Sequence, residues 1–268
     1  MYFVTSISAL ASLIGVAVAD PKLLICSDST TANYSEDDTL QGWGYYIGEY
    51  LSIPVTNLAR NGRSTRSFIN EGLWDALLNA TAAGDFVVIE MGHNDDGDPE
   101  TDAKDRATLP GAGEDTVVVT TAAGNEETVH TFGWYLREMI ADVQAIDAIP
   151  IISGMVNRND WDDGMLQSDW PFASYAEQVA EEEGVEWVDH TAYSVAEFQS
   201  FGETEAKTYY PEDNTHTNPA GARINAETFV QAVKYACGGS SLAAYLNNEG
   251  EAVSEPLAQA CQGYEIII

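Results

Sequence analysis

Five short runs dominated by apolar residues, each followed by a stretch with helical periodicity, constrain the fold of this chain more than any other feature. Runs of four to seven residues are too short for core helices. Their nearly continuous apolar character is typical of strands that are covered on both faces. The sequence therefore predicts five strands, at residues 23–26, 53–58, 85–91, 149–152 and 185–188.

Helices are expected between and after these strands, the last of them beginning at Pro219, a residue favoured in the first turn of a helix. Strands that alternate with helices predict an α/β fold with a parallel sheet between two helical layers. We expect one doubly wound domain, a three-layer α/β/α sandwich with a five-stranded parallel sheet. The predicted helices lie at 42–51, 67–79, 131–147, 172–183 and 219–235.

The stretch from Asp95 to Glu127 interrupts this alternation. It is rich in Asp, Gly and Thr and has a β-prone centre at 117–119. We interpret it as a long insertion after the third strand, at the edge where open sheets bind ligands.

The first 19 residues are predicted to be a secretory signal peptide. Residues 2–19 carry no charged side chain and end in Ala17-Val18-Ala19, a small-x-small cleavage site. The alternative is a membrane anchor, for which the apolar run is short. We expect cleavage after Ala19, a single domain over 20–268 and a secreted, extracellular protein. Glycosylation sequons at Asn33 and Asn79 agree with secretion.

The charge of the chain restricts its partners. With 43 acidic and 11 basic residues, its formal net charge is −32. Such a surface repels nucleic-acid phosphates and anionic lipid headgroups, so neither nucleic acid nor a membrane is expected as a partner. We expect a soluble monomer. An anionic substrate would need basic groups of its own in the cleft.

Three cysteines are present. In a secreted chain Cys237 and Cys261 are predicted to pair and to tie down the C-terminal segment. Cys26 lies in an apolar strand and is expected to be a buried free thiol.

Polar segments follow the predicted strands at the edge where parallel sheets bind ligands. Each segment alone could be an ordinary turn or helix cap. Because the topology brings them to one edge of the sheet, we expect them to form one site. The segments are 27–30, 60–64, 92–95, 157–161 and 213–216.

Together these segments supply the groups that ester hydrolysis needs. Ser29 is the candidate nucleophile, His216 the base that takes its proton, and Asp213 the acceptor that orients the imidazole. The backbone amides of Ser29 and Gly62 and the side-chain amide of Asn94 are candidate oxyanion donors.

The other histidines are expected to be structural, and their spacing suggests no metal site, so we expect neither metal nor cofactor. They are His93, His130 and His190.

The polar segments resemble the ordered sequence blocks of the SGNH, or GDSL-type, hydrolase superfamily, and most of all those of its fungal rhamnogalacturonan acetylesterases. The resemblance covers nearly the whole chain after residue 19. It implies a flavodoxin-like α/β/α sandwich, the same five residues in the same roles, and removal of acetyl groups from the rhamnogalacturonan backbone of pectin. The blocks are Asp28-Ser29-Thr30, Asn61-Gly62-Arg63-Ser64, Gly92-His93-Asn94-Asp95 and Asp213-Asn214-Thr215-His216.

Two features depart from the family pattern. Ser27 stands where the family has glycine, and serine would be strained there if the position required a positive φ. The insertion contains no cysteine, whereas the family has a disulfide there. Because the insertion borders the cleft, the resemblance predicts the chemical reaction more firmly than it predicts which substrate is bound.

The cleft-side loops hold Asn, Arg, Asp and Trp, which suit a short acyl group on a sugar better than a lipid ester. Arg63 is predicted to bind a galacturonate carboxylate, and Trp161 to stack on a sugar ring. Alternatively, some of the arginines near the site, Arg63 among them, pair with nearby acids such as Glu71 or Asp160, and Trp161 covers the core. Two other functions stay open: an esterase for other acetylated glycans or small esters, and a non-catalytic carbohydrate-binding protein.

Overall fold

The computed structural model describes residues 20–255. The predicted signal peptide, 1–19, and Cys261 lie outside the described residues, so the cleavage site and the Cys237–Cys261 pairing stay predictions. Within the described residues, no helix is long and apolar enough to cross a membrane. Cys26 is buried and free, as predicted.

A five-stranded parallel sheet forms the centre of the molecule, with strand order β2-β1-β3-β6-β9. This is the flavodoxin-like order, in which the second strand lies outside the first. The predicted α/β class and all five predicted strands are confirmed. The strands are β1 (Leu23–Ser27), β2 (Val55–Asn57), β3 (Phe86–Glu90), β6 (Ile149–Ser153) and β9 (Glu186–Val188).

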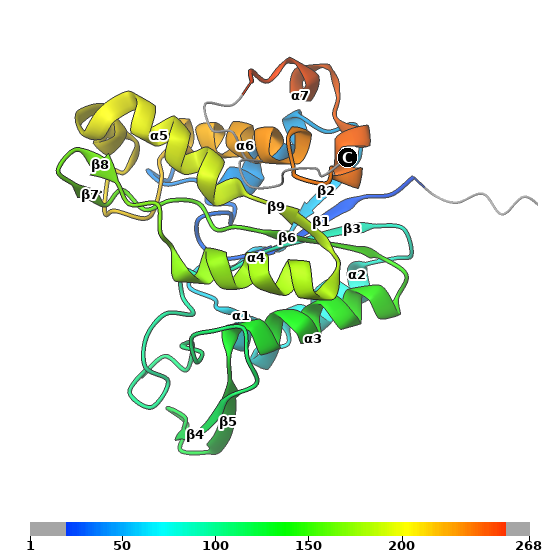
Figure 1. Ribbon diagram of the computed structural model, residues 1–268, viewed down its shortest axis with the longest axis vertical. Helices are drawn as coiled ribbons and strands as arrows, with labels where there is room; N and C mark the ends of the chain where they lie inside the picture. Colours follow the sequence, from blue (N-terminus) through cyan, green and yellow to red (C-terminus); the bar gives the residue numbers. More distant parts are fainter. Residues whose placement is uncertain (1–19, 256–268) are drawn as a thin grey trace, which may run out of the picture.

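Both faces of the sheet are buried, which explains why its strands are apolar throughout. Side chains alternate along a strand, so Leu24 and Val87 pack into one apolar cluster and Leu23 and Val88 into the other. Figure 1 shows the two helical layers. The lower layer holds α1 (Thr65–Asn70), α2 (Leu73–Ala80), α3 (Phe132–Ala145) and α4 (Pro171–Glu183).

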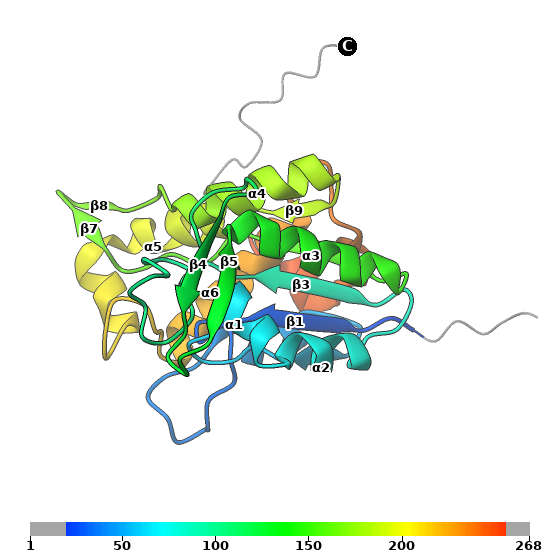
Figure 2. The ribbon, with the colours of Figure 1, turned by 90° about the horizontal axis from the view of Figure 1, so that it is seen from below.

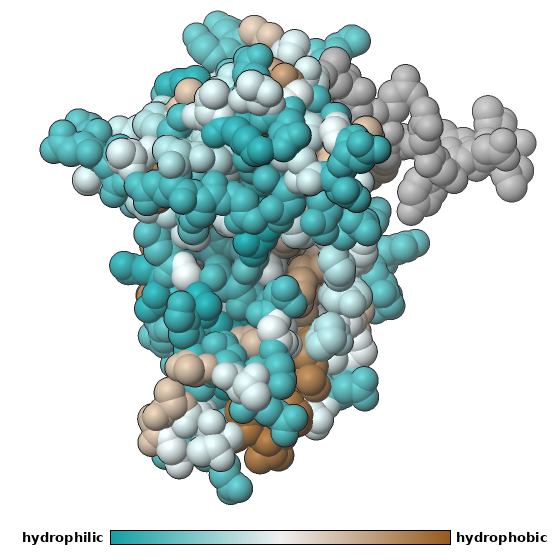
Figure 3. All heavy atoms as spheres, turned by 90° about the vertical axis from the view of Figure 1, so that its left-hand side faces the viewer, coloured by the Kyte–Doolittle hydropathy of each residue, from teal (hydrophilic) through white to brown (hydrophobic). Residues whose placement is uncertain are grey.

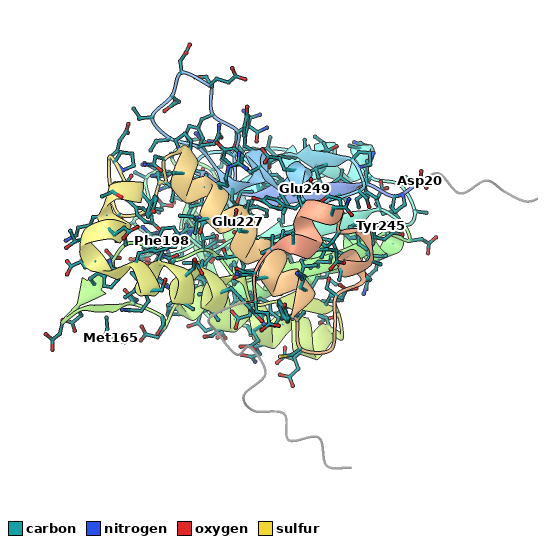
Figure 4. The ribbon with its side chains drawn as sticks, turned by 90° about the horizontal axis from the view of Figure 1, so that it is seen from above. Asp20, Met165, Phe198, Glu227, Tyr245 and Glu249 are labelled. Carbon is teal, nitrogen blue, oxygen red and sulfur yellow. The ribbon has the colours of Figure 1, made fainter. Side chains whose placement is uncertain are left out.

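The upper layer is seen from above in Figure 4, where Phe198, Glu227 and Glu249 mark three of its helices. Phe198 is fully buried, and Glu227 accepts a hydrogen bond from the Tyr50 hydroxyl at 3.1 Å. The helices are α5 (His190–Ala206), α6 (Pro219–Lys234) and α7 (Asn248–Ala252), with the 3-10 helices η1 (Trp43–Tyr45), η2 (Ile47–Glu49), η3 (Lys207–Tyr209) and η4 (Ser241–Tyr245).

Three helical segments differ from the sequence expectation. The helix predicted over 67–79 is two helices, because Gly72 between them has φ +73°. The segment 42–51 forms the 3-10 helices η1 and η2 instead of an α-helix. Helix α5 was not predicted; its apolar positions are weakly periodic, and Gly202 interrupts its helical geometry at φ +75°.

The predicted insertion contains an antiparallel hairpin of β4 (Thr116–Thr120) and β5 (Glu126–His130). The β-prone centre at 117–119 is thus a strand, as expected. The hairpin extends below α3 in Figure 1 and crosses in front of the sheet in Figure 2. A second, shorter hairpin consists of β7 (Trp161–Asp162) and β8 (Met165–Leu166).

Candidate active site

The candidate site lies at the carboxyl ends of the strands, toward the left-hand side of Figure 1. Ser29 follows the end of β1 by two residues, and Asn94 lies in the turn after β3. His216 comes from the segment between η3 and α6, and a hydrogen bond joins it to Ser29 across 187 positions of sequence. The topology therefore brings the predicted segments together.

Ser29 sits in a tight turn that the side chain of Asp28 stabilises. Asp28 Oδ1 accepts hydrogen bonds from the backbone N–H of Thr30 at 2.8 Å and from its hydroxyl at 2.9 Å. Burial raises the pKa of Asp28 to about 6, although the Thr30 hydrogen bonds oppose the shift. Ser29 is 7% exposed.

Two hydrogen bonds link Ser29, His216 and Asp213. His216 Nε2 lies 2.8 Å from Ser29 Oγ, and His216 Nδ1 lies 2.6 Å from Asp213 Oδ2. Because an ionised carboxylate only accepts hydrogen bonds, Nδ1 carries the ring proton and Nε2 accepts the proton of the serine hydroxyl. The three side chains stand in the order that proton transfer from serine to histidine requires.

Asp213 is fixed by its own turn. Its Oδ1 atom accepts the backbone N–H groups of Thr215 at 2.7 Å and His216 at 2.8 Å. Partial burial alone would raise the pKa of Asp213, but hydrogen bonds from His216 and Thr215 outweigh burial and hold the pKa below its ordinary value of 3.8. The carboxylate is therefore ionised at neutral pH and can stabilise a positive charge on the imidazole.

Three N–H groups, one of them the backbone N–H of Ser29, are available to bind an oxyanion. In the described part of the chain, the backbone N–H groups of Ser29 and Gly62 donate to no protein acceptor. Gly62 adopts φ +75°, which favours glycine. Asn94 Nδ2 makes only long contacts, 3.4 Å to Asp28 Oδ2 and 3.3 Å to the Arg63 carbonyl oxygen. These contacts tie Asn94 to the residues next to Ser29 and Gly62.

Sequence reasoning missed Arg106, which the structure places against this cluster. Its NH1 atom donates to Asn94 Oδ1 at 2.9 Å and to the carbonyl oxygen of Gly62 at 3.3 Å. Arg106 comes from the insertion, where no motif or periodicity marks it. The one available signal is that Lys104 and Arg106 are the only basic residues between positions 95 and 127.

Ser27, the departure from the family glycine, is accommodated without backbone strain. It is the last residue of β1 and does not have a positive φ. Its buried Oγ lies 2.6 Å from Thr31 Oγ1 and forms a hydrogen bond with it. The glycine-specific conformation considered for this position is therefore absent.

Arg63 and Trp161 have protein partners in the structure. Arg63 donates to Glu71 Oε2 from Nε at 2.8 Å and from NH2 at 2.7 Å, which is the ion-pair alternative left open by the sequence. Trp161 is half-buried, packs against an apolar cluster that includes Phe198, and donates to Asn159 Oδ1 at 2.6 Å. Contact of either residue with a sugar stays a prediction.

Arg158 lies beside the loop that carries Asp213 and His216. Its NH1 atom donates to Thr215 Oγ1 at 2.7 Å, and NH2 donates to the carbonyl oxygen of His93 at 3.1 Å. Among the described residues, no carboxylate lies within ion-pair distance of Arg158 or Arg106. Most other basic side chains have such a partner, namely Lys22, Arg63, Arg66, Arg137, Lys207 and Arg223.

Two titratable residues are buried behind the site. Burial raises the pKa of Asp95 to about 7, while hydrogen bonds from Thr65 oppose the shift. Burial, followed by the nearby charges of Arg158 and His216, lowers the pKa of His93 to about 3. His93 is therefore neutral at physiological pH and cannot add a positive charge to the site.

The remaining histidines are held by neighbouring residues. His190 is bound at Nδ1 by Glu90 Oε2 at 2.8 Å and at Nε2 by the Asn225 carbonyl oxygen at 2.8 Å. His130 stacks on Trp134 with 3.8 Å between ring centroids. Among residues 20–255, no group of three or more His, Cys, Asp or Glu side chains is placed so that it could hold a metal ion.

The surface around the site is hydrophilic over most of the face shown in Figure 3, which is the left-hand side of Figure 1. Hydrophobic atoms gather in its lower part, where Figure 1 places the β4–β5 hairpin. Val118 of β4 is 60% exposed. A catalytic group set in a hydrophilic face fits a polar substrate better than a long acyl chain.

The sequence matches a known family over the whole region of the site. The profile of the GDSL-like Lipase/Acylhydrolase family matches residues 28–224. A rhamnogalacturonan acetylesterase of Emericella nidulans is 36% identical over 239 residues, which cover 89% of this chain and 92% of that protein.

Solved structures share the fold. The crystal structure of YxiM from Bacillus subtilis superposes with a TM-score of 0.65 at 26% identity, covering 81% of this chain and 57% of that one. This chain thus spans little more than half of YxiM. A catalytic mutant of Axe2, an acetylxylan esterase from Geobacillus stearothermophilus, has a TM-score of 0.52 at 18% identity, covering 79% of this chain and 93% of that one.

Proposed function

Because this chain belongs to the GDSL-like lipase/acylhydrolase family and is a carboxylic ester hydrolase, we propose that it removes acetyl groups from a plant cell-wall polysaccharide, with Ser29 as nucleophile. The observation that carries this proposal is the hydrogen-bond chain from Ser29 Oγ through His216 to Asp213. General-base activation of a serine requires an imidazole nitrogen within hydrogen-bonding distance of the hydroxyl and a ring proton on the other nitrogen. His216 meets both requirements.

The reaction proceeds in two steps. Ser29 Oγ attacks the acetyl carbonyl carbon while its proton passes to His216 Nε2, and the carbonyl oxygen becomes an oxyanion facing the free N–H groups. His216 then returns the proton to the departing sugar oxygen, which leaves an acetyl-serine and a free sugar hydroxyl. Water, deprotonated by His216, attacks the acetyl-serine and releases acetate, after which the proton returns to Ser29.

The polymer that we propose is the rhamnogalacturonan backbone of pectin. The support is the 36% identity to a protein named for that activity, together with a hydrophilic site face. Arg158 and Arg106 add support, because they lack ion-pair partners among the described residues and lie beside the reacting groups. They offer local positive charge for an anionic polymer despite the net charge of −32.

The polymer is tested by measuring acetate released from acetylated rhamnogalacturonan, xylan and mannan under matched conditions. We expect the highest kcat/KM on rhamnogalacturonan. A higher value on xylan or mannan would keep the acetylesterase chemistry and reject the proposed polymer.

The nucleophile is tested by Ser29→Ala. We expect the variant to fold normally and to lose at least about 10⁴-fold of kcat on p-nitrophenyl acetate, as nucleophile loss does in other triads. The thermal unfolding midpoint serves as the control for folding. Retention of more than a few per cent of wild-type kcat would reject Ser29 as the nucleophile. Absence of turnover by the wild-type protein would favour a carbohydrate-binding role.

We further propose that the protein is secreted, with residues 1–19 as its signal peptide. The support is the uncharged N-terminal stretch that ends in Ala17-Val18-Ala19. N-terminal sequencing of protein recovered from the culture medium should begin at Asp20.

A further inference from the structure

Arg106 determines which way the side-chain amide of Asn94 faces. A guanidinium has five N–H donors and no acceptor, whereas a carboxamide can present either oxygen or nitrogen. The 2.9 Å contact from Arg106 NH1 is therefore satisfied only by Asn94 Oδ1. Its Nδ2 group is consequently turned toward Asp28 and the Arg63 carbonyl oxygen, on the side of Ser29.

The other contacts of Asn94 are too long to hold this orientation firmly. Nδ2 lies 3.4 Å from Asp28 Oδ2 and 3.3 Å from the Arg63 carbonyl oxygen, at the limit of hydrogen bonding. If the amide rotated by half a turn, Asn94 Oδ1 would face the oxyanion and repel it. The charged hydrogen bond from Arg106 is thus the strongest restraint on the donor.

The same guanidinium also makes a longer hydrogen bond to the residue of the second oxyanion donor. Arg106 NH1 lies 3.3 Å from the carbonyl oxygen of Gly62, whose φ of +75° places it in a conformation that few residues share. One side chain therefore bridges the two loops that follow β2 and β3, and connects two of the proposed donors.

The backbone that carries Arg106 is held from both sides. The carboxylate of Asp102 accepts the backbone N–H of Arg106 at 2.6 Å and that of Ala107 at 2.8 Å. The buried side chain of Arg66 donates to the Ala107 carbonyl oxygen at 3.0 Å and forms an ion pair with Glu127. A rigid support of this kind is what a preorganised oxyanion site needs.

From these contacts we propose that Arg106 is a positioning residue of the oxyanion hole, acting through Asn94 and Gly62. The inference rests on the proposed esterase function. It assigns to the insertion after β3 a part in the chemical step itself, besides any part in substrate choice. Because no carboxylate among residues 20–255 lies within ion-pair distance of the Arg106 guanidinium, its charge also favours a nearby oxyanion.

The experiment is a double-mutant cycle with Arg106→Met and Asn94→Ala, measured on p-nitrophenyl acetate. This substrate has no sugar and no carboxylate, so kcat reports the acyl-transfer machinery alone. Lys104→Met is the matched control, because it removes an exposed cation from the same insertion. Thermal unfolding midpoints verify that each variant is folded, and Arg106→Ala, which also removes the donor, enters the same cycle if Arg106→Met does not fold.

We expect Arg106→Met to lower kcat by about 10- to 100-fold with little change in KM, and Lys104→Met to leave both unchanged. Because Arg106 acts largely through Asn94, the double variant should lose no more than about 3-fold beyond Asn94→Ala. Fully multiplicative losses, a loss confined to KM, or wild-type kcat in a folded Arg106 variant would each overturn the inference. A wild-type protein without esterase activity would instead overturn the proposed function.

Discussion

In the proposed mechanism Asn94 contributes a side-chain donor, because its contacts to Asp28 and Arg63 are long and leave it available to a developing negative charge. A group that binds the oxyanion more strongly than the ground-state carbonyl lowers the barrier without improving substrate binding. We therefore expect Asn94→Ala to lower kcat by about 10²- to 10³-fold with little change in KM. Steady-state kinetics on p-nitrophenyl acetate test this. A loss expressed only in KM would make Asn94 a substrate-binding residue.

Arg158 and Arg63 are alternative candidates for binding a galacturonate carboxylate. Arg158 contacts Thr215 and the His93 carbonyl oxygen and has N–H donors left over, whereas Arg63 is engaged by Glu71. We expect Arg158→Ala to lower kcat/KM on acetylated rhamnogalacturonan about 10-fold or more, with a smaller loss on p-nitrophenyl acetate. The loss on the polymer should shrink as salt is added, because screening weakens exposed ion pairs.

Arg63→Ala is measured beside it as the competing assignment. A polymer-selective loss in Arg63→Ala and none in Arg158→Ala would restore the contact that the sequence predicted. Equal losses on both substrates in Arg158→Ala would show that this arginine supports the Asp213–His216 loop instead of binding the sugar.

The start of the 3-10 helix η1 supports the Ser29 turn. The Gly42 N–H donates to the Ala32 carbonyl oxygen at 3.1 Å, and the Trp43 N–H donates to the Thr30 carbonyl oxygen at 3.0 Å. This close approach is possible because Gly42 has no side chain. A Cβ atom at Gly42 would lie 2.3 Å from the Ala32 carbonyl oxygen.

We therefore expect Gly42→Ala to destabilise the protein by about 2–3 kcal/mol, since the clash is with backbone atoms and cannot be relieved by a rotamer change. The displaced turn should also lower kcat. Gly48→Ala in η2 is the control, because its Cβ would meet only Val55 Cγ2, at 3.9 Å. Urea unfolding of both variants measures the difference. Similar unfolding free energies for the two would contradict this account of the turn.

The stability of the whole molecule is expected to depend on pH through its buried carboxyl groups. Burial raises the pKa of Asp28 to about 6 and that of Asp95 to about 7, from an ordinary value of 3.8. The folded protein therefore binds these protons more tightly than the unfolded chain, and stability falls as the pH rises between the two values. Asp213 acts in the opposite sense, because its lowered pKa adds stability that is lost only as the pH falls below its ordinary range.

The unfolding midpoint is therefore expected to be higher at pH 5 than at pH 7.5, at equal ionic strength. Thermal unfolding followed by circular dichroism measures it. Asp95→Asn, which mimics the protonated carboxyl, should reduce the difference. Added salt separates this effect from general repulsion among the 43 acidic residues, since salt screens surface charge far more than buried charge. A higher midpoint at pH 7.5 would contradict the raised pKa values of Asp28 and Asp95.

Strand positions, fold class and the family were determined by the sequence alone. Strands covered on both faces must be apolar throughout, so 23–26 and 85–91 were visible without any structure. Ser29, Gly62 and Asn94 could be named because each directly follows a strand or lies in a short family motif. The sequence did not reveal α5, because the weak periodicity of its apolar residues carries no clear helical signal.

Contacts across long loops were decided only by the tertiary structure. Arg106 meets Asn94 and Gly62 because Arg66 and Asp102 fix the path of an irregular insertion, and irregular backbone has no repeat from which a side-chain direction can be read. In the same way, Arg63 forms an ion pair with Glu71 because the fold places these two opposite charges close together. Sequence specifies which groups are present near a sheet edge, whereas packing decides which of them meet, because a hydrogen bond depends on distances of a few tenths of an ångström.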